Sequence, residues 1–171
     1  DRELTSLELD VLAAPELPGG GPGRPAHGNF VLSELVATLV RGEERRPVRL
    51  ARALADHHQR GTPVWAPEHA IDGERGTGWA VGGGIGRPHR LLVGLAEPLR
   101  APGATLELRL EQFYGGQHLI ARLDARLSSR PLPAPGLDVG RPDAPARGAR
   151  AAGEPGVQAR GRGPPAADPL A

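Results

Sequence analysis

The sequence predicts an antiparallel all-β fold over about residues 4–129, followed by a tail without regular structure. Apolar and polar side chains alternate with a period of two in several short segments, the pattern of strands that bury one face. Glycine and proline account for 25 and 19 of the 171 residues. This content disfavours a helix bundle and favours strands joined by many turns.

The predicted strands begin near the start of the chain. Residues 7–11 alternate apolar and acidic side chains and form the first strand. Residues 29–40 carry apolar pairs every four residues, a spacing that fits a helix, but their Phe, Val and Thr content fits a strand equally well. The neighbouring strands and glycine-rich turns favour the strand. Another strand begins at Val48 and Leu50, and the apolar run 90–95 is compatible with a buried strand.

The last two predicted strands lie on either side of a glycine turn. Leucines alternate with charged residues over 106–110, and a second alternation covers 119–127. Between them lie Gly115 and Gly116. We therefore expect residues 105–111 and 118–127 to pair as antiparallel neighbours.

Composition changes sharply after Arg130 and predicts a boundary there. Residues 131–171 contain nine prolines and seven glycines but only five Leu, Ile, Val and Phe residues. So few apolar side chains cannot offset the entropy of ordering a chain. We expect a foldable module over residues 1–130 and a disordered, low-complexity tail rich in Pro, Gly, Ala and Arg over 131–171.

Charge and cysteine content exclude several classes of protein. The formal net charge is +1, and all 21 basic residues are arginines scattered along the chain. A nucleic-acid module would show a basic face, so no nucleic-acid partner is expected. The absence of cysteine excludes a disulfide framework, a cysteine zinc site and c-type haem attachment, so no haem is expected in this segment.

Nothing in the sequence predicts insertion into a membrane. No apolar run approaches the about 18 residues of a membrane helix, and the start does not have the pattern of a signal peptide. The chain begins Asp1-Arg2-Glu3 without a methionine, which indicates a fragment of a longer protein.

No catalytic constellation is recognisable. None of the four serines lies in a Gly-x-Ser-x-Gly motif. The glycine-rich segment 19–24 lacks the Gly-Lys-Ser/Thr ending of a phosphate-binding loop and is interpreted as a flexible connector. The adjacent His57 and His58 would face opposite ways on a strand, which is unsuited to a shared zinc ion. We predict that the chain is not an enzyme.

Only five residues are aromatic, so each is informative. Phe30 and Trp79 are interpreted as core residues. Trp65 and Tyr114 lie nearer to predicted loops. There they could present an aromatic face to a sugar, beside side chains that form hydrogen bonds with it. The alternative is that both rings pack as partly buried residues without a ligand. His118 and Gln117 follow the glycine turn beside Tyr114. The candidate ligand-binding residues are therefore Tyr114, His118, Gln117 and Trp65.

A second candidate site is the turn at Asp72 and Gly73. Asp bonds its own backbone in tight turns, and Gly accepts a positive φ. A carboxylate on such a turn, close to the hydroxyl of Thr77 and to backbone carbonyls, is the oxygen environment that calcium prefers. The same residues also fit an ordinary surface turn without a metal.

Four phrases stand in this order along the chain: Leu17-Pro-Gly-Gly-Gly-Pro-Gly-Arg24, Gly28-Asn-Phe-Val-Leu-Ser-Glu34, Ala70-Ile-Asp-Gly73 with Thr77-Gly-Trp79, and Gln112-Phe-Tyr-Gly-Gly-Gln-His118. Together they resemble a module of planctomycete-type multidomain proteins that carry cytochrome c domains. That module is similar in turn to the discoidin family, of the coagulation-factor C-domain type. The resemblance covers about residues 4–129 and weakens over 121–127, where the module tends towards Gly-Arg-Phe-Arg-Leu-Ser.

The resemblance implies a galactose-binding-like jelly roll, which is an antiparallel β-sandwich. It implies a noncatalytic binding module, glycan-directed, within a larger envelope or secreted protein. The alternative is a structural spacer that packs against neighbouring cytochrome or catalytic domains without a small ligand. The resemblance also implies a structural calcium ion held by Asp72 and Thr77, with a second carboxylate from Glu34, because residues 32–36 resemble the strand that closes discoidin domains.

Overall fold

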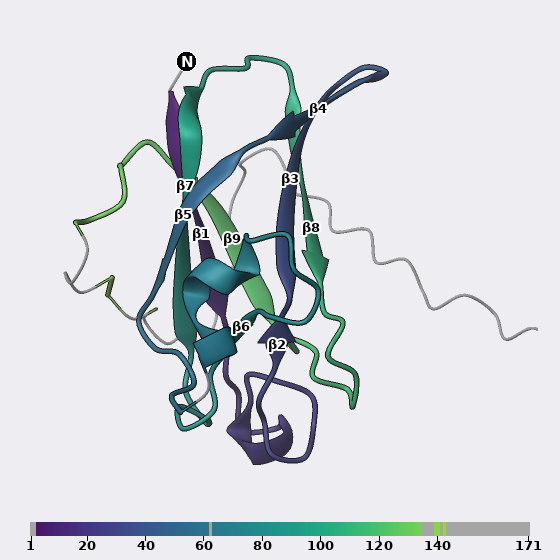
Figure 1. Ribbon diagram of the computed structural model, residues 1–171, viewed down its shortest axis with the longest axis vertical. Coiled ribbons are helices and arrows are strands. Elements are labelled where there is room, and N and C mark those ends of the chain that lie inside the picture. The colour runs from purple at the N-terminus through teal and green to yellow at the C-terminus, as the bar shows by residue number, and fades with distance from the viewer. Residues whose placement is uncertain (1–2, 62, 135–138, 141, 143–171) are drawn as a thin grey trace, which may run out of the picture.

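The computed structural model describes residues 3–61, 63–134, 139–140 and 142 (Figure 1). The predicted antiparallel all-β fold is confirmed, since every strand pairing in the described part is antiparallel. The strands are β1 (Leu4–Val11), β2 (Val31–Leu32), β3 (Glu34–Arg41), β4 (Glu44–Val48), β5 (Leu50–Ala55), β6 (Trp79–Ala80), β7 (His89–Leu99), β8 (Thr105–Glu111) and β9 (Leu123–Ser128). Short 3-10 helices are η1 (Pro18–Gly20), η2 (Pro63–Trp65) and η3 (Pro67–Ala70).

The strands form three sheets. A four-stranded sheet has the order β5-β7-β1-β9, a three-stranded sheet has the order β4-β3-β8, and β2 pairs with β6 in a third. In Figure 1 the four-stranded sheet lies beside the strands β3 and β8, and the loop that precedes β2 and the loop that follows β8 gather at one end. The galactose-binding-like jelly-roll assignment stays a prediction.

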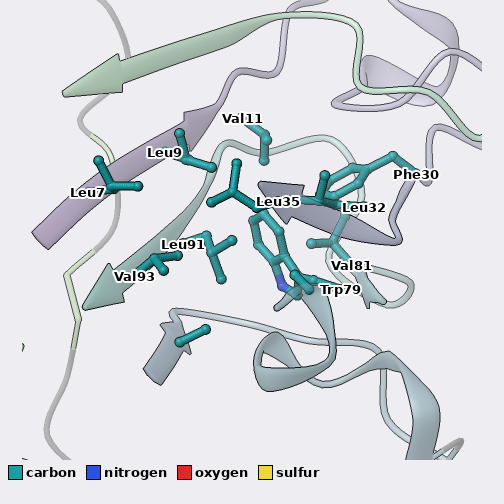
Figure 2. Close-up of a cluster of buried hydrophobic side chains, with 12 residues drawn as sticks. Leu7, Leu9, Val11, Phe30, Leu32, Leu35, Trp79, Val81, Leu91 and Val93 are labelled. Atoms are coloured by element: carbon teal, nitrogen blue, oxygen red, sulfur yellow. The ribbon is translucent and has the colours of Figure 1, made fainter. Parts of the chain in front are cut away.

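One apolar core joins these sheets (Figure 2). Trp79 is fully buried, and its ring meets the ring of Phe30 edge to face with 5.0 Å between the centroids. The Trp79 Nε1–H donates to the carbonyl of His57 at 2.9 Å, which satisfies the one polar atom of this side chain. Both residues lie in the core, as the sequence predicts. Its other fully buried large members are Leu7, Leu9, Val11, Leu32, Val81, Leu91 and Val93.

The segment whose periodicity is ambiguous forms strands. Residues 31–32 and 34–41 are β2 and β3, with Ser33 between them. The Ser33 N–H donates to the carbonyl of Glu111, and its hydroxyl accepts a bond from the N–H of Phe113. Pairing with neighbouring strands therefore decides this segment, where the local apolar spacing could not.

The predicted hairpin between residues 105–111 and 118–127 is wrong. β8 pairs with β3, whereas β9 pairs with β1 in the other large sheet. The connection over residues 112–122 is far longer than a tight turn, and it crosses from one sheet to the other. An alternating pattern indicates which face of a strand is buried, but it does not indicate which strand it pairs with. The last strand is also shorter than predicted, since β9 begins only at Leu123.

The glycine-rich segment predicted to be a flexible connector is closely packed. Gly21, Pro22 and Gly23 are buried. A Cβ on Gly23 would lie 1.7 Å from the carbonyl oxygen of Asn29, so only glycine allows the two backbones to approach this closely.

Residues that follow the predicted boundary at 130 still contact the four-stranded sheet. The Arg52 guanidinium donates to the carbonyl of Pro133, and the Leu132 side chain lies over Gly94. The predicted disordered tail falls almost entirely outside the described residues. None of the helices in the described part of the chain is long and apolar enough to cross a membrane.

Candidate functional site

Aromatic rings from three separate segments meet at the end of the molecule that holds the loop between β8 and β9. The ring of Tyr114 lies 4.5 Å from that of His118 and 5.4 Å from that of Trp65, both edge to face. His27 adds a fourth ring, 4.9 Å from His118. We call these four residues the aromatic cluster. Trp65 arrives on η2, and His27 arrives on the loop before β2.

The loop between β8 and β9 holds its shape through its own backbone. Gly115, Gly116 and Gln117 all have positive φ values, of 82°, 54° and 59°. The N–H of His118 then donates to the carbonyl of Gly115 at 3.0 Å, while the carbonyl of His118 accepts a bond from the N–H of Val31. The two glycines therefore permit the turn, and the bond to β2 fixes the position of His118.

The aromatic cluster is accessible from solvent. Tyr114 is 56% exposed, while Trp65 and His118 are half-buried. Beside the cluster, the guanidinium carbon of Arg75 lies 3.9 Å from the ring centroid of the exposed Phe113, a cation–π contact. This end of the molecule thus presents aromatic surface together with hydrogen-bonding groups.

The Asp72 turn is a second polar site. Asp72 Oδ1 accepts a bond from the N–H of Glu74 at 2.8 Å, and the Thr77 hydroxyl lies 3.1 Å and 2.9 Å from the two carboxylate oxygens. His69 Nδ1 lies 2.8 Å from Asp72 Oδ2, and its Nε2 lies 2.9 Å from the carbonyl oxygen of Pro63. This turn is therefore joined to η2, the element that ends at Trp65.

Glu34 reaches the same turn from the three-stranded sheet. Its Oε1 accepts a bond from the N–H of Gly73 at 2.6 Å, and the residue is buried. Burial raises the pKa of Glu34, and the neighbouring carboxylate of Asp72 adds to this rise although the Gly73 N–H opposes it. The structure thus brings together all three residues predicted to hold calcium.

Asp72 titrates in the opposite direction. Burial opposes its ionisation, but hydrogen bonds from the Glu74 N–H, His69, Thr77 and Glu34 together lower its pKa. One carboxyl of this pair therefore favours the protonated form while the other favours the ionised form.

The oxygen atoms of this turn are of the kinds that a hard cation binds. Two carboxylates converge with the Thr77 hydroxyl, which lies 2.9 Å from the carbonyl oxygen of Glu74. Calcium takes carboxylate, hydroxyl and carbonyl oxygens. Among the described residues, however, no group of three or more His, Cys, Asp or Glu side chains is placed to hold a metal ion. A calcium ion here would depend on the hydroxyl and on backbone carbonyls, and calcium stays a prediction.

A third polar region, which the sequence analysis did not find, lies around His57 and His89. Their rings stack at 5.1 Å. His89 is fully buried, with Nδ1 3.0 Å from Asp56 Oδ2 and Nε2 2.7 Å from the carbonyl oxygen of Gly84. Both ring nitrogens of His89 therefore face an oxygen atom inside the fold. No local motif reveals this group, because the pairing of β5 with β7 brings these residues together.

Two open hollows share Gln59 and Arg60 in their linings. One has a volume of about 470 Å³ and reaches η2, with a lining of His58, Gln59, Arg60, Gly61, Pro63 and Ala66. The other has a volume of about 570 Å³ and is lined by His57, Gln59, Arg60, Gly82 and Gly83.

Of the predicted ligand-binding residues, the structure brings together Tyr114, His118 and Trp65. Gln117 lies in the same loop and is exposed, and its side chain makes no hydrogen bond within the described part of the chain. The sequence did not indicate that His27 belongs to this cluster. Its ring reaches His118 only because the glycine segment that precedes it is folded and packed. In comparisons with known proteins, no protein-family model, no curated protein and no solved structure matches this chain.

Proposed function

We propose that this chain is a noncatalytic binding module whose aromatic cluster binds a saccharide. The observation that carries the proposal is the convergence of Trp65, Tyr114 and His118 from two distant segments on one exposed loop end. Exposed aromatic side chains gathered in this way are unusual on a surface that has no binding role.

The chemistry of the aromatic cluster suits a neutral sugar. The C–H faces of a pyranose ring can pack on the exposed ring of Tyr114, and the adjacent polar groups can bond its hydroxyls. His118 Nδ1 lies 2.9 Å from the carbonyl oxygen of Gly115, which leaves Nε2 as the ring nitrogen to bond a ligand. The exposed amide of Gln117 supplies both a donor and an acceptor.

The composition of the aromatic cluster favours binding over hydrolysis. It consists of two aromatic and two imidazole side chains. Most glycoside hydrolases flank the scissile bond with a pair of carboxylates. The carboxylates of the neighbouring turn, Glu34 and Asp72, instead accept bonds from the backbone N–H groups of Gly73 and Glu74. By the resemblance described above, we propose that the module belongs to a larger envelope or secreted protein.

A structural calcium ion at the Asp72 turn is part of this proposal. The ion would be held by Asp72, Thr77 and Glu34, and it would balance the charge of two adjacent carboxylates. It would perform no chemistry. Because His69 connects this turn to Pro63, a stiffer turn would also hold η2 and Trp65 in place.

The experiment is a saccharide array probed with the intact chain, followed by titration of each sugar that binds. Tyr114→Ala should abolish measurable binding, whereas Tyr114→Phe keeps the ring and should retain most of it. Thermal melts of both variants verify that they are folded. Binding that survives Tyr114→Ala, or an array without any ligand, would reject the aromatic cluster as the site.

One observation favours the alternative of a structural spacer. Leu119, Leu123 and Leu127, in and before the edge strand β9, are 36%, 37% and 47% exposed. Contacts with a neighbouring domain of the same protein could cover them. In that case Leu127→Ser would weaken the attachment of such a domain, and Tyr114→Ala would not.

A further inference from the structure

The hollow lined by His57, Gln59, Arg60, Gly82 and Gly83 carries positive charge and is called the cationic hollow below. Arg60 is exposed, and its guanidinium forms no ion pair with any described carboxylate. An arginine that lines a hollow without a partner has all its donors available to a ligand.

A second guanidinium, that of Arg87, adds to the positive potential. It lies close enough for its charge to contribute to a lowered pKa of His57. Its Nε is buried and has no hydrogen-bond partner among the described residues. Arg87 is not among the residues that line the hollow, so its contribution is its positive charge near His57.

The nearest negative charge is already engaged. The side chain of Asp56 is 2% exposed, and its oxygens accept bonds from His89 Nδ1 and from the N–H of Arg90. This buried carboxylate therefore pairs with His89, and among the described residues it forms no ion pair with Arg60.

The walls of the cationic hollow are fixed by the fold. Gln59 donates its N–H to the carbonyl of Ala80 at 2.8 Å, and its side-chain oxygen accepts a bond from Asn29 Nδ2 at 2.9 Å. A Cβ on Gly82 would lie 2.3 Å from that same oxygen. The glycine loop thus packs directly on Gln59, and the hollow exists before any ligand arrives.

We propose that the cationic hollow binds an oxyanion, the carboxylate or sulfate group of an acidic ligand, between Arg60 and His57. Guanidinium groups bond such anions through paired donors in a favourable geometry. The site shares no residue with the aromatic cluster, so this inference goes beyond the proposed function.

The state of His57 supports this proposal. Burial lowers its pKa, the contact of Nε2 with the carbonyl of Gly82 opposes this, and the charges of His89 and Arg87 lower the pKa further. The charged groups that act on His57 are Asp56, His89 and Arg87, and Arg60 lines the same hollow. A bound oxyanion would reverse the balance, so binding should take up a proton on His57 and tighten as pH falls.

The experiment follows the imidazole resonances of His57 by NMR across a pH series, with sodium sulfate as the probe. Sodium chloride at equal ionic strength corrects for screening. Sulfate should raise the pKa of His57, and Arg60→Gln should weaken sulfate binding about tenfold through loss of a charge-assisted contact. Arg46→Gln is the matched control, because Arg46 is exposed on β4 in the other large sheet.

Two further measurements are needed. One distinguishes an acidic saccharide from a free anion as the ligand, and the other distinguishes this site from the aromatic cluster. Galacturonate that binds where galactose does not would identify an acidic saccharide, whereas sulfate alone would identify a free anion. Tyr114→Ala should leave the response of His57 unchanged even if it abolishes saccharide binding at the aromatic cluster. The inference fails if sulfate raises the pKa of His57 no more than chloride does, or if the Arg60→Gln variant binds sulfate as tightly as the wild type.

Discussion

Glu34 on β3 accepts a hydrogen bond of 2.6 Å from the N–H of Gly73, and this bond anchors the Asp72 turn to the three-stranded sheet. The turn continues through His69 to the carbonyl of Pro63, at the start of the element that carries Trp65. Hydrogen bonds therefore connect the Asp72 turn to the aromatic cluster, and a change in the conformation of the turn should alter the position of Trp65.

The first prediction concerns pH. The hydrogen bond to Asp72 raises the pKa of His69, although partial burial opposes this rise. A raised pKa means that the stabilising contribution is complete below the unfolded value of 6.5 and is lost as pH rises through the folded pKa. Urea unfolding in the presence of chelator should therefore show stability falling above pH 6.5, by about 1 kcal/mol or less.

The pH range chosen for this test separates His69 from its neighbours. His57 has a lowered pKa, so its contribution changes below 6.5 and in the opposite direction. His69→Gln keeps a polar side chain without a titrating group, and it should abolish the fall in stability above pH 6.5. A fall of equal size in this variant would assign the effect to another group.

The second prediction compares the two tryptophans. Trp79 is fully buried against Phe30, so Trp79→Ala should cost about 3–5 kcal/mol of unfolding free energy. Trp65 is half-buried near a loop, and Trp65→Ala should cost about 1 kcal/mol. Denaturant melts measure both values, and equal small losses would contradict the place of Trp79 in the core.

The strands of this fold could be predicted because their side chains face one core. Leu7 and Leu9 alternate with acidic residues along β1, and both leucines are fully buried in the structure. The alternation breaks at Asp10, which is buried and pairs with Arg90 and Arg126. The partner of each strand could not be predicted in this way. The leucines of β8 pack against the core, whereas β9 packs against it through Ala125 and leaves Leu123 and Leu127 exposed. The two strands belong to different sheets, and a period of two is the same in either case.

The candidate sites divide in a similar way. Tyr114 and His118 are close in sequence, and the glycine turn between them already indicated an exposed loop. The approach of Glu34 to the Asp72 turn was expected from a resemblance and agrees with the structure. The cationic hollow has no local signal, because His57 and Gly82 meet only through the packing of loops that lie far apart in the chain.

The third prediction concerns the close approach of two backbones at Gly23. A Cβ at this position would lie 1.7 Å from the carbonyl oxygen of Asn29, and neither backbone can move without disturbing β2. Gly23→Ala should therefore destabilise the fold by about 3 kcal/mol or more.

Gly76→Ala provides the control for Gly23→Ala, because nothing lies within 4 Å of a Cβ there and the backbone does not require glycine. Its melting temperature should stay near that of the wild type. Similar melting temperatures for the two variants would show that the segment around Gly23 is looser than the structure indicates.

The last prediction is the response to calcium. Two carboxylates held close together repel each other without a cation, and the neighbouring charge of Asp72 already contributes to the raised pKa of Glu34. Calcium should therefore stabilise the folded chain, by about 2.7 kcal/mol at a hundredfold excess over its dissociation constant. Thermal melts with calcium and with chelator measure the shift.

Variants decide whether such a shift belongs to the Asp72 turn. Asp72→Ala removes the carboxylate that both Thr77 and Glu74 contact, so calcium should no longer raise its melting temperature. Asp124→Ala is the matched control, because Asp124 lies on β9 and pairs with Arg126. The control should keep the full calcium response. A wild-type chain that melts at the same temperature with calcium and with chelator would leave Asp72 as a turn residue held by its own hydrogen bonds, since those bonds already satisfy both of its oxygens.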